Sequence, residues 1–165
     1  MKTTEIEKKI EHLLPMEIEK RSFEIIAEEL AARKIVLPPD QDPITRRVIH
    51  TSADFEYAET MRYSEGAIAR AKELICSGAD IVTDTNMALS GINKKQLAKF
   101  GGQAHCFMAD ETVAKLAAER KTTRAAVSME MAAKIDKPVI FAVGNAPTAL
   151  IQLYEMIQQG SYIPA

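Results

Sequence analysis

The chain has 165 residues, and its 21 lysines and arginines against 23 aspartates and glutamates give a net charge of −2. That balance excludes a general positive field for nucleic acid or an anionic membrane, and 47% hydrophobic residues fit a single globular domain over residues 1–165. The sequence starts with the mixed-charge segment MKTTEIEKKIEHLL and has no long apolar run, which argues against a secretory signal and a membrane-spanning helix. Cys76 and Cys106 are isolated in the sequence, which favours the cytoplasm.

Two helices are predicted in the first third of the chain. The first starts near Pro15, and its apolar side chains recur at helical spacing at Ile18, Phe23, Ile26, Ala27 and Leu30. A proline-rich break over residues 37–43 ends it. The second helix is predicted to begin with Asp42 as the N-cap and Pro43 at the first helical position.

Helices and strands alternate from residue 64 onward. Short apolar runs predict strands over residues 80–84, 104–108 and 138–144. Helical patterns fall on residues 64–76, 93–100, 110–119, 123–134 and 146–158. This alternation is typical of a parallel sheet with both faces covered. The predicted fold class is therefore α/β, a three-layer α/β/α arrangement with a mainly parallel sheet.

Two polar clusters follow predicted strands, at residues 83–86 (TDTN) and 144–148 (GNAPT). Ligands bind at the carboxyl ends of parallel strands, and a helix N-terminus suits a carboxylate or a phosphate. Asn145 is predicted to cap the helix that follows it. On these residues alone, ordinary turn and capping chemistry is the favoured explanation.

Nucleotide, esterase and metal signatures are missing from the sequence. It contains no phosphate-binding loop and no G-x-S-x-G, and Gly101-Gly102 lack the dinucleotide-binding spacing. His105 and Cys106 are adjacent in a predicted strand, so their side chains point to opposite faces and cannot share a metal ion. We interpret both as packing residues, and His12 as a solvated one.

His50 lies in the segment RRVIHTSADF, residues 46–55. Arg46 lies one turn behind it, and Arg47 three residues behind it. A cation beside an imidazole favours the neutral ring, which can accept or donate a proton near neutral pH. Thr51 and Ser52 add hydroxyl groups. A lone histidine on a helix is nevertheless more often structural than catalytic, and spacing alone does not decide between the two.

Five segments together resemble the precorrin-8X methylmutase (precorrin isomerase) family. They are RRVIHTSADF, DIVTDTNMALSGINK, HCFMAD, KTTRAAVSME and VGNAPTALIQLYEM. The resemblance runs from about Lys20 to the last residue, in the order of the family. The forms TDTNMALSGINK and CFMAD are closer to the branch that acts on cobalt-containing intermediates.

The resemblance implies an isomerase of corrin-ring biosynthesis. A methyl group would move from carbon 11 to carbon 12 of precorrin-8X or cobalt-precorrin-8, giving hydrogenobyrinate or cobyrinate. It implies no cofactor, since any cobalt is carried by the corrinoid substrate, and it implies a homodimer. The catalytic histidine of the family, thought to protonate the macrocycle, falls on His50.

The resemblance also places substrate-binding residues. The family's serine falls on Ser22, and its two arginines fall on Arg47 and Arg124, where guanidinium groups would meet the carboxylates of the ring. Thr51, from the histidine segment, and Asn145 and Thr148, from the second polar cluster, complete the predicted set. Without the resemblance, we would interpret Ser22 as a solvent-facing helix residue and the two arginines as solvated charges. The position of Arg124 at a predicted helix start nevertheless independently suits anion binding.

The chain departs from the family at its end. Family members usually continue with an apolar, glycine-rich segment, and this sequence stops at SYIPA, where that strand should start. We therefore expect a C-terminally short domain that lacks part of the pocket. Two alternatives stay open: a non-catalytic tetrapyrrole-binding protein with the same pocket, and a nucleotide-binding regulatory domain, against which the missing phosphate loop counts. The sequence does not decide between a metal-free and a cobalt-containing substrate.

Overall fold

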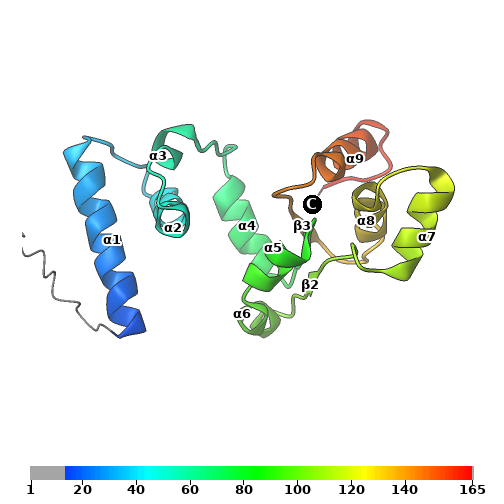
Figure 1. Cartoon of the computed structure of the whole chain (residues 1–165), viewed down its shortest axis with the longest axis horizontal. Coiled ribbons are helices and arrows are strands. Elements are labelled where there is room, and N and C mark those ends of the chain that lie inside the picture. The colour runs from blue at the N-terminus through cyan, green and yellow to red at the C-terminus, as the bar shows by residue number, and fades with distance from the viewer. Residues whose placement is uncertain (1–13, 165) are drawn as a thin grey trace, which may run out of the picture. The chain divides into compact units, whose positions relative to one another are not determined.

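The computed structural model describes residues 14–164, so the interpretation of His12 lies outside the described residues. Of the described residues, 14–68 form one compact unit and 69–164 form a second. The prediction of one domain over the whole chain stays a prediction. The helices and strands (Figure 1) are α1 Pro15–Ala32, α2 Asp42–Ser52, α3 Tyr57–Thr60, α4 Ala67–Cys76, β1 Asp80–Thr83, α5 Asn86–Gly91, α6 Lys94–Lys99, β2 Ala104–His105, α7 Glu111–Arg120, α8 Arg124–Ala132, β3 Val139–Ala142 and α9 Pro147–Gln158.

The first unit is built on the packing of α1 against α2. Ile26 and Leu30 of α1 are buried with Ile49 of α2. The predicted apolar stripe of α1 is confirmed from Phe23 onward, but Ile18 is 54% exposed and lies outside this core. An apolar residue at helical spacing is therefore not always a core residue, because the stripe can run past the end of the partner helix.

The predicted N-cap of α2 is wrong by one residue. Asp42 is the first helical residue, and the cap position is held by Gln41 without a side-chain hydrogen bond. The Asp42 carboxylate instead accepts a hydrogen bond from Nε of Arg46 at 2.7 Å. A carboxylate engaged with the next turn is not free to turn back to the first N–H groups.

The second unit contains a parallel three-stranded sheet in the order β2-β1-β3. Ile81 of β1 pairs with Ala104 of β2 on one side and with Ile140 of β3 on the other. The predicted parallel sheet is therefore confirmed, with strands shorter than predicted. Gly102, which precedes β2, lies so close to β1 that an added Cβ would collide with the backbone oxygen of Ala79. This close approach is the structural reason for a glycine there.

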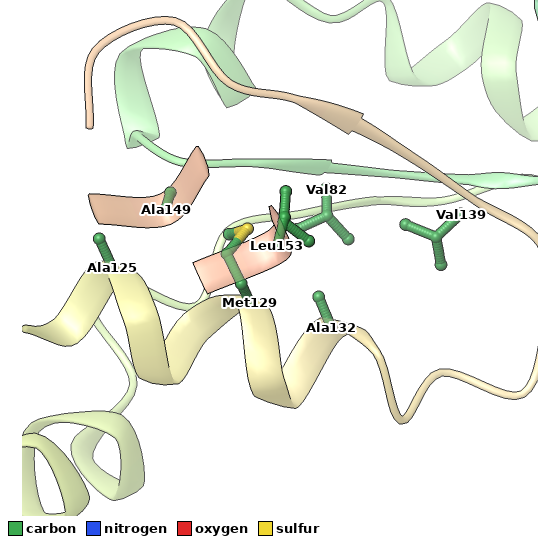
Figure 2. Packing of buried hydrophobic residues seen from close by; sticks show 7 residues of the cluster. All are labelled: Val82, Ala125, Met129, Ala132, Val139, Ala149 and Leu153. Carbon is green, nitrogen blue, oxygen red and sulfur yellow. The ribbon is translucent and has the colours of Figure 1, made fainter. Parts of the chain in front are cut away.

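The main core of the second unit lies between the sheet and the helices α8 and α9. Figure 2 shows side chains of α8 and α9 gathered beneath Val82 of β1 and Val139 of β3. The helix residues of this cluster are Ala125, Met129, Ala132, Ala149 and Leu153. Helices α5 and α6 lie on the other side of the sheet (Figure 1). Helices thus flank the sheet on both sides, which confirms the predicted α/β class.

Two short helices, α3 and α5, were not predicted. The four residues of α3 and the six of α5 are too few to show a helical period. Thr85, which reads as part of a polar cluster, caps α5 by accepting a hydrogen bond from the Ala88 N–H at 3.2 Å. Among residues 14–164, no helix is both long enough and apolar enough to cross a membrane.

Candidate functional site

His50 lies on α2, and two residues of α1 contact its ring. Ser22 Oγ lies 2.7 Å from His50 Nδ1, and the ring of Phe23 stacks on the imidazole with centroids 5.1 Å apart and planes 16° apart. We call Glu19, Ser22, Phe23, Arg47 and His50 the His50 cluster. The alternative that Ser22 is a solvent-facing helix residue is wrong, since its side chain is half-buried and bonded to His50.

The contact with Ser22 leaves one ring nitrogen of His50 available for chemistry. The Ser22 hydroxyl oxygen can accept from Nδ1–H in the protonated ring and also in the neutral ring that has lost its proton from Nε2, so the contact survives in both states. In the described part of the chain, no side chain or backbone group hydrogen-bonds to Nε2 of His50. The arrangement therefore suits a histidine that exchanges a proton at Nε2.

The arginines near His50 are already paired. Arg47 contacts Glu19 at 2.7 Å, and its guanidinium carbon lies 4.7 Å from the centroid of the Phe23 ring. Arg46 is bonded to Asp42 at 2.7 Å. The pair with Glu19 is about half exposed, and such pairs contribute little to stability. A carboxylate of a ligand can therefore compete with Glu19 for Arg47.

The hydroxyl groups after His50 bond within their own helix. Thr51 Oγ1 donates to the carbonyl of Arg47 at 2.9 Å, and Ser52 Oγ donates to that of Val48 at 2.8 Å. Both side chains are exposed. Their hydroxyl oxygens keep acceptor capacity, and the role of Thr51 in substrate binding stays a prediction.

Asp84 organises the loop after β3 in the second unit. It follows β1, is fully buried, and its Oδ2 accepts the N–H groups of Gly144, Asn145 and Ala146 at 3.2, 2.7 and 2.7 Å. Burial raises the pKa of Asp84, but these backbone hydrogen bonds outweigh it and hold the pKa below its ordinary value. Asp84 is therefore a buried carboxylate that fixes the start of α9. We call residues 143–147 the Asp84 loop.

The predicted capping role of Asn145 is wrong. The N-cap of α9 is Ala146, without a side-chain hydrogen bond, and Asn145 and Thr148 are exposed. Asp84 occupies the N–H groups of residues 144–146, just before the helix, so these groups are not available to a ligand carboxylate. A groove of about 320 Å³ lies along the Asp84 loop and Leu150. Asn145 lines this groove, so its substrate-binding role stays a prediction, as does that of Thr148.

Arg124 is the first residue of α8, as predicted. Thr123 caps that helix by accepting a hydrogen bond from the Ala126 N–H at 3.1 Å. The Arg124 side chain is exposed, and none of the ion pairs found among residues 14–164 includes it. An exposed guanidinium at a helix N-terminus is suited to an anion of the ligand.

His105 is not only a packing residue, which corrects the expectation from its sequence. Its Nε2 lies 2.9 Å from Oδ2 of Asp80, and Lys137 Nζ lies 3.1 Å from the other oxygen of Asp80. Burial raises the pKa of Asp80, but the hydrogen bonds from His105, from the Gln103 N–H and from Lys137 together hold it below its ordinary value. This network, centred on the buried Asp80, joins β1 to β2 and to the residues before β3. Within the described residues, no three histidine, cysteine, aspartate or glutamate side chains gather as metal ligands.

Comparison with known proteins gives the family. The profile of the precorrin-8X methylmutases matches residues 17–165. The chain belongs to the precorrin-8X methylmutase family. This confirms the resemblance that was based on the histidine segment and the GNAPTAL segment.

Named relatives support the assignment to this family. A cobalt-precorrin-8 methylmutase of Priestia megaterium is 41% identical over 150 residues, which cover 91% of this chain and 66% of that protein. One of Salmonella typhimurium is 38% identical over 145 residues, covering 86% and 69%. A solved precorrin-8X methylmutase structure from Thermus thermophilus is 36% identical with a TM-score of 0.77, covering 90% of this chain and 71% of that one. The chain thus spans about two thirds of the length of these methylmutases.

The residues assigned from the family resemblance are distributed over both units. Within the first unit, the structure brings Ser22, Arg47 and His50 together on two facing helices. Phe23 and Glu19 belong to the same cluster and were missed as site residues. Both lie within one turn of Ser22, which is the signal that could have identified them.

Proposed function

We propose that this chain is a methylmutase of corrin biosynthesis, which moves a methyl group from carbon 11 to carbon 12 of precorrin-8X or cobalt-precorrin-8. The products are hydrogenobyrinate and cobyrinate, respectively. The observation that carries the proposal is the geometry of His50, bonded to Ser22 at Nδ1 and unbonded at Nε2 in the described chain. Family membership supplies the reaction for which that histidine is suited.

In this mechanism His50 delivers a proton from Nε2 to the macrocycle beside the migrating methyl group. Protonation interrupts the starting conjugation and lowers the barrier to the shift. The reaction is an isomerisation, so the macrocycle returns one proton to His50 before product leaves. Ser22 stays bonded to Nδ1 throughout, because the ring keeps its Nδ1–H when Nε2 gives up its proton and the hydroxyl oxygen accepts from it in both states.

Substrate carboxylates are held by guanidinium groups in this proposal. Arg47 exchanges Glu19 for a carboxylate of the ring, and Arg124 binds another at the start of α8. Thr51, Asn145 and Thr148 add polar contacts. The reaction needs no cofactor, and cobalt, where present, enters as part of the substrate. The free thiols Cys76 and Cys106 suit the cytoplasm as the proposed compartment.

We expect faster conversion of the cobalt-containing substrate, because the two relatives of highest identity described above are named cobalt-precorrin-8 methylmutases. Anaerobic incubation of the chain with precorrin-8X and with cobalt-precorrin-8, followed by absorbance, tests both the reaction and the preference. A single spectral change on mixing, without later conversion of either compound, would instead identify a tetrapyrrole-binding protein. Conversion of the metal-free compound alone would contradict the preference.

We further propose that the chain acts as a homodimer, because a large acidic macrocycle needs more protein wall than one small chain offers. Sedimentation at micromolar concentration is expected to show a species of twice the 18.2 kDa chain mass. The Priestia megaterium methylmutase, measured under the same conditions, is the control for the longer members of the family. A lone species of 18.2 kDa would contradict the proposal for this chain.

A further inference from the structure

Phe23 contacts both functional groups of α2. Its ring is nearly parallel to the imidazole of His50, with centroids 5.1 Å apart, and the guanidinium of Arg47 lies over the same ring at 4.7 Å. Arg47 and His50 are separated by three residues and therefore share a face of α2. A single aromatic side chain thus links the predicted carboxylate-binding group to the predicted proton donor.

The stack constrains His50 in a way that the Ser22 hydrogen bond does not. The bond to Nδ1 fixes one distance, and the imidazole can still tilt about that contact. A face-to-face stack fixes the plane of the ring, and with it the direction in which Nε2 points. Proton transfer requires a heavy-atom distance of about 3 Å and good alignment, so the ring plane affects the rate directly.

Phe23 is itself held in place from two sides. It packs against the buried cluster of Ile26, Leu30 and Ile49. The guanidinium of Arg47, which also contacts Glu19 at 2.7 Å, lies over the same ring. Glu19, Ser22 and Phe23 stand at positions i, i+3 and i+4 of α1, so one helical turn supplies all three contacts to α2.

We propose that Phe23 is a positioning residue that sets the plane of the His50 ring, with the buried cluster of Ile26, Leu30 and Ile49 holding Phe23 in place. This inference rests on the methylmutase function proposed above. It assigns Phe23 a role in kcat rather than in substrate affinity, because the phenyl ring acts on the proton donor and not on the substrate. Misplacement of a reacting group by about 1 Å can cost about 100-fold in rate.

The test replaces Phe23 with leucine, which keeps an apolar side chain against the core and removes the flat ring. We expect kcat to fall about 10- to 100-fold, with a smaller change in KM. Phe23→Tyr keeps the ring and is expected to retain most of the activity. Phe55→Leu is the matched control, because Phe55 packs against the same buried cluster and lies under Arg33 at 4.5 Å instead of Arg47.

A second readout does not depend on activity. The ¹⁵N shifts of the His50 ring, assigned with His50→Gln, report the hydrogen bonding at Nδ1, whose alignment with Ser22 Oγ worsens when the ring tilts. Phe23→Leu should move these shifts toward those of a free imidazole, and Phe55→Leu should leave them unchanged. If Phe23→Leu changes the shifts but the parent chain does not convert the substrate, the result supports the positioning of His50 by Phe23 and rejects the proposed methylmutase function. If the parent chain is active but Phe23→Leu leaves the shifts and kcat unchanged, the positioning role is overturned. It is also overturned if Phe55→Leu lowers kcat as much as Phe23→Leu does.

Discussion

Replacing His50 with glutamine is expected to lower turnover by about 10²–10⁴, the usual contribution of general acid–base catalysis. The glutamine amide matches the imidazole in size and can bond to Ser22, but it carries no proton to transfer at neutral pH. Corrin binding should survive, because the guanidinium groups of Arg47 and Arg124 are unchanged. Turnover is measured by the absorbance assay, and binding by titration with the product.

His105→Gln is the matched control for this substitution. It removes the other described histidine, and its amide can still donate to Asp80 in place of the 2.9 Å contact. We expect turnover within a few-fold of the parent chain. If His50→Gln retained near-normal turnover, or if both variants lost activity equally, His50 would not be the proton donor.

Replacing Asp84 with asparagine is expected to lower the free energy of unfolding by about 3 kcal/mol. The carboxylate is fully buried and accepts three backbone N–H groups through Oδ2. Its Oδ1 has no hydrogen-bond partner in the described part of the chain, so these three donors carry its stabilisation. A neutral amide accepts the same hydrogen bonds more weakly and must bury an NH₂ group. Urea denaturation of the two proteins at pH 7 measures the loss.

The effect of Asp84→Asn depends on pH in a defined direction. Backbone hydrogen bonds hold the pKa of Asp84 below its unfolded value despite burial, which acts in the opposite sense. The stabilisation is therefore fully present above the unfolded pKa, about 3.9, and is lost as pH falls through the lower folded pKa. The difference in stability between the parent and Asp84→Asn should be constant near neutrality and should narrow below about pH 4.

Asp110→Asn is the control, because Asp110 also accepts two backbone N–H groups, at the start of α7, but lies nearer to solvent. A much smaller loss is expected. Equal losses in the two variants, or a difference for Asp84→Asn that grows in acid, would contradict the role assigned to Asp84.

The elements that the sequence predicted are those with a local signal. The side of α1 that faces the core is predicted by apolar residues spaced three and four positions apart. The strands β1 and β3 are predicted by short apolar runs bounded by polar residues. The contacts that build the site join residues far apart in the chain. Ser22 and His50 are separated by 28 positions, His105 and Asp80 by 25, and Asn145 and Asp84 by 61. A periodic pattern along the sequence does not indicate which residues of such distant segments are in contact.

Asn145 illustrates why the predicted cap failed. An asparagine near a proline at a helix start suggests a cap, but Ala146 lies between Asn145 and Pro147 and holds the cap position. A buried carboxylate from another strand end instead accepts the N–H groups of the residues just before the helix. A tertiary contact, from Asp84, therefore fixes this loop in place of a local side-chain cap. The family resemblance named both Ser22 and His50 as site residues, and in the structure they are in contact; their roles stay predictions.

The most direct test of the account follows the methyl group itself. Substrate labelled with ¹³C in the methyl group on carbon 11 is incubated anaerobically with the chain and examined by NMR. The account predicts that the labelled signal moves to the position of a methyl group on carbon 12, and that it stays in place with His50→Gln over the same time. A label that remains on carbon 11 with the parent chain, while the corrinoid is bound, would contradict the proposal that this chain is a methylmutase.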